Sequence, residues 1–147
     1  MREFRPSQVL LVEDNQDDVE ILRRALERSR IPNELYVARD GQEALDLLFG
    51  GADGAASLRP DLVILDVNTP RVNGLEVLER IRASDQFGTM PVVVLTVSDR
   101  EEDVVRSYQL GANTYIQKPP EFQQFVHVLE VLGEYWFAVA KLPRRAA

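Results

Sequence analysis

Three acidic residues follow two apolar segments of the chain, at points where buried strands would end. Glu13 and Asp14 come directly after residues 9–12, and Asp66 comes directly after residues 62–65. If both segments are neighbouring parallel strands, their carboxyl ends share one edge of the sheet and the three carboxylates meet in one pocket. Such carboxylates repel one another unless a cation offsets them, and Mg²⁺, or Mn²⁺ in its place, prefers oxygen ligands of this kind. Each acid taken alone also fits an ordinary solvated turn or a helix cap.

Two further polar residues follow the next two expected strands. Thr96 comes after residues 92–95, and Lys118 comes after residues 114–117. A hydroxyl can donate to one phosphoryl oxygen, an ammonium can neutralise another, and a metal ion can bind a third. Among the 17 basic residues only Lys118 and Lys141 are lysines, which indicates that a compact ammonium is needed at position 118. Together with the acids, these residues predict a site for a phosphoryl group.

Asp66 is the best nucleophile among the three acids because it ends a central apolar strand. Its carboxylate would attack phosphorus and form an acyl phosphate. The loop that follows contains Asn68, Pro70 and Gly74, and the backbone carbonyl of Asn68 would add a ligand for the metal ion. The same loop also fits a plain turn before a helix that starts near Gly74.

Short apolar runs alternate with segments of helical periodicity along the chain. Residues 9–12, 62–65 and 92–95 are unbroken apolar runs, typical of parallel strands that are covered on both faces. Residues 35–38 and 114–117 are more polar and suit positions nearer the edges of the sheet. The alternation predicts an α/β fold of the flavodoxin-like, doubly wound (βα)5 type, with three layers and a five-stranded parallel sheet in the order 2-1-3-4-5.

Length and composition predict one domain that spans residues 1–147, with a core at about 8–132 and no output domain. The absence of cysteine excludes disulfides and thiolate metal sites. A net charge of -7 argues against direct DNA binding, and no apolar run approaches the roughly 20 residues of a membrane span. We therefore expect a soluble, cytoplasmic protein. Residues 50–57 are rich in small side chains and should form an extended loop.

These residues in this order resemble the response regulator receiver family of two-component signalling. The family motif is an acidic pair after the first strand, an aspartate after the third, a threonine after the fourth and Lys-Pro after the fifth. The matching positions are Glu13, Asp14, Asp66, Thr96, Lys118 and Pro119. The resemblance covers about residues 9–132, and the loop at 50–57 lengthens the separation between Asp14 and Asp66. The acids behind Asn15 and the turn after Asp66 are similar to the small regulators that partner bacterial phytochromes.

The resemblance implies phosphorelay signalling. Asp66 would accept the phosphoryl group of a sensor histidine kinase, and the candidate kinase is a bacterial phytochrome. Glu13 and Asp14 would carry Mg²⁺, or Mn²⁺, together with Asp66 and the Asn68 carbonyl, while Lys118 would contact the phosphoryl group.

The resemblance further implies that Thr96 and Tyr115 form a switch pair. On phosphorylation the Thr96 hydroxyl would move toward the phosphate and the Tyr115 ring would turn inward. This would alter the surface formed by the fourth helix, fifth strand and fifth helix, and so control binding of an unknown downstream protein or dimerisation. Val97 departs from the family pattern, which has a smaller residue there, and would restrict access of water to the acyl phosphate.

The C-terminal segment carries more apolar surface than one sheet can cover. Apolar residues return at helical spacing and predict a helix at about 121–141 that extends past the domain core. A second apolar line lies on another face of that helix, which indicates a homodimer through it, with a folded-back tail as the alternative. The candidate dimer residues are Phe122, Val128, Val131, Tyr135 and Trp136.

Two other functions are consistent with parts of this pattern. A phosphatase with an aspartyl nucleophile would need a second aspartate as general acid two residues after Asp66, but that position holds Asn68. We therefore expect no turnover of external substrates, although the acyl phosphate would hydrolyse on the protein itself. A degenerate receiver that only binds a partner through its last helix remains open, although retention of every site residue argues against it.

Overall fold

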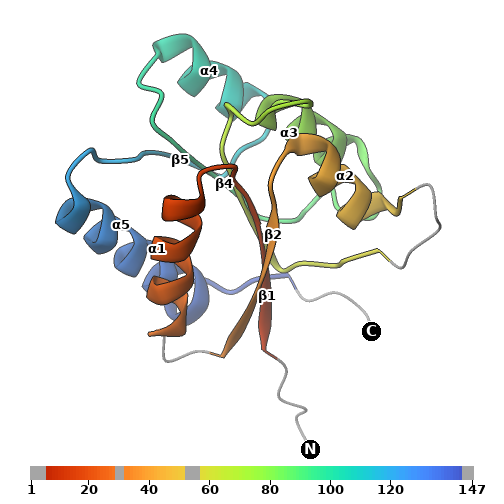
Figure 1. Ribbon diagram of the computed structural model, residues 1–147. Coiled ribbons are helices and arrows are strands. Elements are labelled where there is room, and N and C mark those ends of the chain that lie inside the picture. The colour runs from red at the N-terminus through yellow and green to blue at the C-terminus, as the bar shows by residue number, and fades with distance from the viewer. Residues whose placement is uncertain (1–5, 29–31, 52–56, 144–147) are drawn as a thin grey trace, which may run out of the picture.

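The computed structural model describes residues 6–28, 32–51 and 57–143. Strands and helices alternate from the N-terminus to the C-terminus (Figure 1). The strands are β1 (Ser7–Val12), β2 (Asn33–Ala38), β3 (Leu62–Leu65), β4 (Val92–Thr96) and β5 (Thr114–Gln117). The helices are α1 (Gln16–Glu27), α2 (Gly41–Phe49), α3 (Gly74–Ala83), α4 (Glu101–Gln109), α5 (Phe122–Glu134) and the π-helix η1 (Tyr135–Val139).

The five strands form one parallel sheet in the order β2-β1-β3-β4-β5, which confirms the predicted fold and strand order. The three apolar strands β1, β3 and β4 occupy the centre, where both faces of a strand are buried. The more polar strands β2 and β5 lie at the two edges, as their composition predicted.

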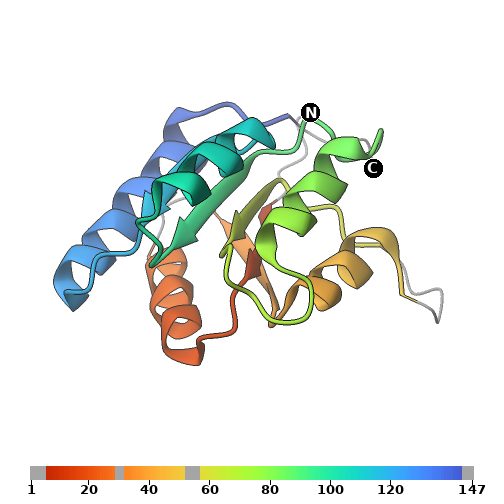
Figure 2. The same ribbon diagram turned by 90° about the horizontal axis from the view of Figure 1, so that it is seen from above.

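Helices cover both faces of the sheet and complete three layers (Figures 1 and 2). One face packs against α1 and α5 through a core that includes Leu22 and Leu129. The other face packs against α2 and α3 through a core that includes Leu48 and Leu78. Alternate residues of each central strand belong to the two cores, so the sheet is held rigidly between them and can position the residues at its edge.

Several helices begin with a side chain that caps their first turn. Asn15 accepts a hydrogen bond from the backbone of Asp18 at 3.1 Å, and Asn73 accepts one from the backbone of Glu76 at 3.1 Å. These caps satisfy backbone N–H groups that have no partner inside the helix. They fix the starting points of α1 and α3, the helices that follow β1 and β3.

The C-terminal segment differs in one respect from the expected helix. It is helical over 122–139, but α5 ends at Glu134 and the last five residues, Tyr135–Val139, are a π-helix. The N–H of Ala140 bonds to the carbonyl of Tyr135 at 2.6 Å, a spacing of five residues instead of four. In the predicted loop at 50–57, residues 52–56 lie outside the described residues. No helix in the described part of the chain is long and apolar enough to cross a bilayer.

Candidate functional site

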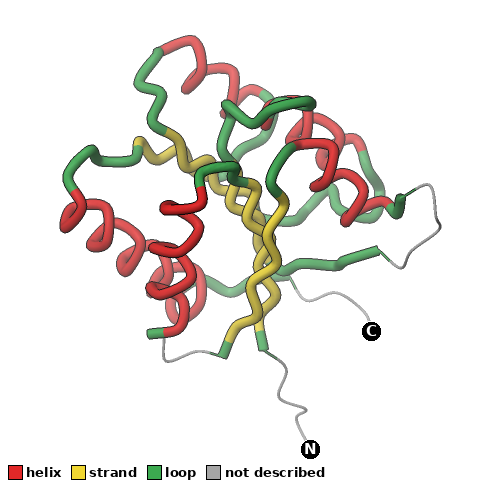
Figure 3. The backbone as a smooth tube through the Cα atoms, viewed as in Figure 1, coloured by secondary structure: helices red, strands yellow, loops and turns green. Residues whose placement is uncertain are grey.

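The loops that follow the strands gather at one end of the sheet (Figure 3). The register of β1 and β3 pairs Val12 with Leu65, so Glu13 and Asp66 leave the sheet side by side. The N–H of Asp66 bonds to the carbonyl of Val12 at 3.1 Å and extends the pairing by one residue. The expected convergence of these two carboxylates is therefore built by the backbone of the central strands.

Lys118 lies at the centre of the site. Its ammonium bonds to a carboxylate oxygen of Glu13, to Oδ2 of Asp18 at 2.9 Å and to Oδ2 of Asp66 at 3.2 Å. The Lys118 side chain is 5% exposed, so this charge has left bulk water. Its backbone is held by an N–H bond to the carbonyl of Thr96 at 2.7 Å. The side chain thus spans from the β5 edge of the sheet to residues that follow β1 and β3.

Burial and the charged neighbours shift the pKa values of this cluster. Burial raises the pKa of Glu13 to about 7, against the opposing effect of the Lys118 ammonium. Burial acts against the charge of Lys118, but its bonds to Glu13 and Asp18 outweigh this effect and raise its pKa above the usual range. Lys118 is therefore a permanent cation at physiological pH, whereas Glu13 can take up a proton.

Asp66 is held in a single orientation. Its Oδ1 accepts a hydrogen bond from the backbone of Asn68 at 2.9 Å, while its Oδ2 faces Lys118. Gly74, the first residue of α3, lies so close to the end of β3 that an added Cβ would stand 2.2 Å from the carbonyl oxygen of Asp66. The glycine lets α3 start directly beside the strand, and this contact fixes the loop that carries Asn68.

Thr96 and Tyr115 are connected through Ser98. Thr96 is fully buried and its hydroxyl accepts a bond from the backbone of Ser98 at 3.4 Å. The hydroxyl of Tyr115 donates to the carbonyl of Ser98 at 2.9 Å, so the ring already lies against the loop after β4. Ser98 in turn bonds to Asp103 in α4 at 2.5 Å. The chain of contacts leads from the site to α4.

The structure gathers most, but not all, of the predicted site residues in one contact network. Glu13, Asp66 and Lys118 are in direct contact, whereas Asp14 is exposed on the same loop. Within residues 6–28, 32–51 and 57–143, no group of three or more His, Cys, Asp or Glu side chains is arranged as a ready metal site. The ammonium of Lys118 lies between the carboxylates that were expected to bind the metal ion.

Asp18 is a member of this contact network to which the sequence analysis assigned no role. It lies in the first turn of α1 and bonds to Lys118, which is 100 residues further along the chain. The available signal was its position: the start of α1 lies at the same edge of the sheet as the other acids, and an acid there also suits the helix dipole.

Comparisons with known proteins agree with this geometry. Residues 9–130 match the model of the response regulator receiver domain. The response regulator Rcp1 of Synechocystis sp. is 36% identical over 138 residues, which cover 94% of this chain and 94% of that protein.

Solved structures extend the likeness to the whole fold. The Mn²⁺-bound form of Rcp1 superposes with a TM-score of 0.91 at 35% identity, covering 95% of this chain and 100% of that one. The phosphorylated cyanobacterial phytochrome response regulator RcpA also gives a TM-score of 0.91, at 37% identity and the same coverage. The bacteriophytochrome response regulator AtBRR is 45% identical, with a TM-score of 0.69 over 90% of this chain and 96% of that one.

Proposed function

The chain belongs to the response regulator receiver family, and on that premise we propose that Asp66 is the residue that accepts the phosphoryl group from a sensor histidine kinase. As a member of this family the protein is a phosphorelay signal transducer of two-component systems rather than an enzyme. The observation that carries the assignment is the contact of the buried Lys118 ammonium with Oδ2 of Asp66, because a phosphoryl group on Asp66 would lie within reach of this cation.

The proposed chemistry needs a nucleophilic carboxylate oxygen and charge neutralisation. A bond forms between Asp66 and phosphorus while the bond between phosphorus and the donor histidine breaks, and its electron pair leaves on the imidazole. Lys118 neutralises part of the charge on the phosphoryl oxygens, and the Asn68 N–H keeps the Asp66 carboxylate oriented during attack. Self-dephosphorylation belongs to the proposal, and we expect Val97 to slow it by limiting access of water.

The donor groups present fit a divalent cation. Four carboxylates lie at this edge of the sheet against one ammonium, so the cluster holds more negative charge than Lys118 neutralises. Glu13, Asp14 and Asp66 would hold Mg²⁺ or Mn²⁺ through their carboxylates, and Asn68 through its backbone carbonyl; these are the oxygen ligands that such ions prefer. When bound, the ion would supply further neutralisation of the phosphoryl oxygens. The Mn²⁺-bound form of Rcp1 supports this proposal.

The output would travel through Thr96 and Tyr115. Movement of the Thr96 hydroxyl toward a phosphoryl group would break the hydrogen bond that the Ser98 N–H now donates to this hydroxyl. Because Ser98 also binds Tyr115 and Asp103, the shift would reach β5 and the start of α4. A downstream protein or a second copy of the chain would then read the surface of α4, β5 and α5. The likeness to phytochrome response regulators supports a bacterial phytochrome as the kinase.

The phosphoacceptor is tested by incubation with acetyl phosphate and Mg²⁺, followed by intact-mass measurement. We expect the parent protein to gain one phosphoryl group and Asp66→Asn to gain none. The matched control is Asp85→Asn, which removes the same charge from an exposed position. Asp85 lies between α3 and β4, at the amino ends of the strands and therefore at the other end of the sheet from Asp66. Labelling of Asp66→Asn at the parental rate, or loss of labelling in Asp85→Asn, would count against Asp66 as the acceptor.

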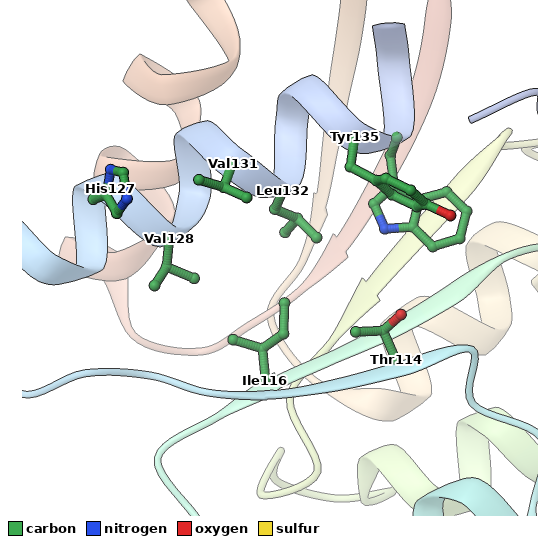
Figure 4. Close-up of a pocket in the computed structure, with 8 residues that line it drawn as sticks. Thr114, Ile116, His127, Val128, Val131, Leu132 and Tyr135 are labelled. Atoms are coloured by element: carbon green, nitrogen blue, oxygen red, sulfur yellow. The ribbon is translucent and has the colours of Figure 1, made fainter. Parts of the chain in front are cut away.

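We also propose that the outer face of α5 pairs two copies of the chain. Val131 and Tyr135 are 53% and 50% exposed although they are large apolar side chains, and Phe122, at the start of the helix, is 57% exposed. Val128, Val131, Tyr135 and Trp136 line one groove beside β5, in which Figure 4 labels the first three. A self-complementary apolar face of this kind suits a two-fold dimer.

Sedimentation equilibrium tests the dimer. We expect the parent to approach twice its 16.7 kDa mass, and Val131→Glu to raise the dissociation constant at least about tenfold, because a charge would be buried in an apolar contact. Ala83→Glu, at an exposed position at the end of α3 on the other face of the sheet, should leave the dissociation constant unchanged. A monomeric parent, or equal effects of the two variants, would remove α5 as the interface.

A further inference from the structure

The hydrogen-bonding capacity of Lys118 is fully used in this structure. An ammonium has three N–H donors, and those of Lys118 are directed at the carboxylates of Glu13, Asp18 and Asp66. Two of these carboxylates, on Glu13 and Asp66, belong to the set that we propose for the metal ion. A cation bound there and the ammonium of Lys118 would compete for the same oxygens.

A buried ammonium that loses two of three partners needs the third to remain. The Lys118 side chain is 5% exposed, and an unpaired charge at such a position is strongly unfavourable. Among the residues that the structure describes, Asp18 is the one partner of the Lys118 ammonium outside the proposed metal set. Its side chain is 21% exposed, so its own charge stays partly hydrated and it can serve as a partner at lower desolvation cost than Glu13 or Asp66.

The backbone holds Asp18 in place by a short chain of bonds. The N–H of Asn15 donates to Oε2 of Glu13 at 3.2 Å, and the side chain of Asn15 accepts the N–H of Asp18 at 3.1 Å. The first turn of α1 is therefore tied to the same glutamate that contacts Lys118. Asp17, the neighbouring residue in that turn, is exposed and is not one of the carboxylates bonded to Lys118.

We propose that Asp18 is a positioning residue for Lys118, which retains the ammonium beside Asp66 when a divalent cation takes the oxygens of Glu13 and Asp66. This inference rests on the proposed metal site. Without the Asp18 carboxylate, metal binding would leave the Lys118 ammonium with no buried partner, and its head group would move out to solvent and leave the phosphoryl position without a cation.

Nuclear magnetic resonance of the lysine ammonium groups tests this directly. The chain has two lysines, so selective ¹⁵N labelling of lysine limits the ammonium signals to Lys118 and the exposed Lys141, and only the buried Lys118 is expected to give a visible proton signal. Ammonium protons that are hydrogen-bonded and buried exchange slowly with water and stay visible. We expect Mg²⁺ to shift the Lys118 signal of the parent and of Asp17→Ala without removing it, and to abolish it in Asp18→Ala through rapid exchange.

Metal affinity supplies an independent readout, measured as free Mn²⁺ by electron paramagnetic resonance. We expect Asp18→Ala to weaken Mn²⁺ binding at least about tenfold, as for other residues that orient a metal site. Asp17→Ala removes the same charge from the same helical turn and should weaken binding by less than about threefold, because an exposed charge is screened. This pair separates contact with Lys118 from general electrostatics and from helix stability.

The outcomes separate this proposal from the one on which it rests. If the Lys118 signal of Asp18→Ala persists in Mg²⁺ as in the parent, or if both variants bind Mn²⁺ alike, the role of Asp18 is overturned while the metal site stands. If Mg²⁺ leaves the Lys118 signal of the parent unmoved and Mn²⁺ does not bind, the metal site itself is wrong, and the role of Asp18 is refuted with it. Labelling of Asp66 by acetyl phosphate is measured separately and reports on the phosphoacceptor alone.

Discussion

Replacing Lys118 with methionine should lower the free energy of unfolding by about 3–5 kcal/mol at neutral pH, because it leaves buried carboxylates without their cation. Glu13 and Asp66 are 4% and 9% exposed and share this single ammonium. Methionine keeps most of the side-chain volume, so the loss reports on charge rather than on a cavity. Urea unfolding followed by the fluorescence of Trp136, the only tryptophan, measures the change.

Two conditions should reduce this destabilisation. Burial raises the pKa of Glu13 to about 7 in the parent although Lys118 lowers it, so without Lys118 this pKa lies higher still; the folded variant therefore takes up a proton at Glu13 as pH falls toward neutrality, and one of the repelling charges disappears. Saturating Mg²⁺ should also recover much of the loss, because the ion replaces the missing cation. Lys141→Met, at the exposed second lysine, is the control and should be neutral. Equal stability of the two variants in the absence of metal would show that the carboxylate cluster does not depend on Lys118.

Replacing Gly74 with alanine should cost roughly 2–4 kcal/mol of stability, because the new methyl group meets backbone and not a movable side chain. The added Cβ would lie 2.2 Å from the Asp66 carbonyl oxygen and 2.8 Å from the Cα of Val67. Relief requires α3 to move away from the end of β3, which would also displace the Asp66 carboxylate. We therefore expect slower labelling by acetyl phosphate in addition to a lower urea midpoint.

Gly133→Ala is the matched control for this substitution. Gly133 lies within α5, and a Cβ there would find its nearest neighbour, a ring carbon of Phe137, at 4.0 Å. Alanine should stabilise this helix by about 0.5–1 kcal/mol through its better helix propensity. The two glycine substitutions thus have opposite expected signs. A parental urea midpoint for Gly74→Ala would mean that α3 tolerates the shift and that the close approach is not required.

The strand bounds illustrate what hydropathy can and cannot detect. The apolar runs located β1, β3 and β4, because a strand buried on both faces must be apolar throughout. The first strand nevertheless starts at Ser7, two residues before the apolar run, and β2 starts at Asn33. Ser7 lies opposite Asn33 in the register of the two strands, and its N–H donates to the backbone carbonyl of Pro32 at 3.0 Å, a bond that involves no side chain. Hydropathy describes side chains, so it cannot detect such backbone hydrogen bonds.

The end of the last helix shows a similar limit. Apolar spacing predicted a helix to about residue 141, and the chain is helical to Val139. The pattern could not reveal that Tyr135–Val139 form a π-helix, because apolar spacing over five residues does not distinguish a four-residue from a five-residue hydrogen bond.

The residue types and their spacing are enough to predict the chemistry of the site: carboxylates, a hydroxyl and one of two lysines lie at the carboxyl ends of parallel strands. That inference needs only the periodicity of each segment and the rule that the carboxyl ends of parallel strands meet at one edge of the sheet. Which of those groups contact one another could be read only from the three-dimensional packing. The contact between Lys118 and Asp18 joins residues 100 positions apart, and it depends on the register of the strands and on the cap that fixes the first turn of α1. No local sequence pattern predicts this contact, because the two side chains are brought together by the packing of the whole sheet between its two helical layers.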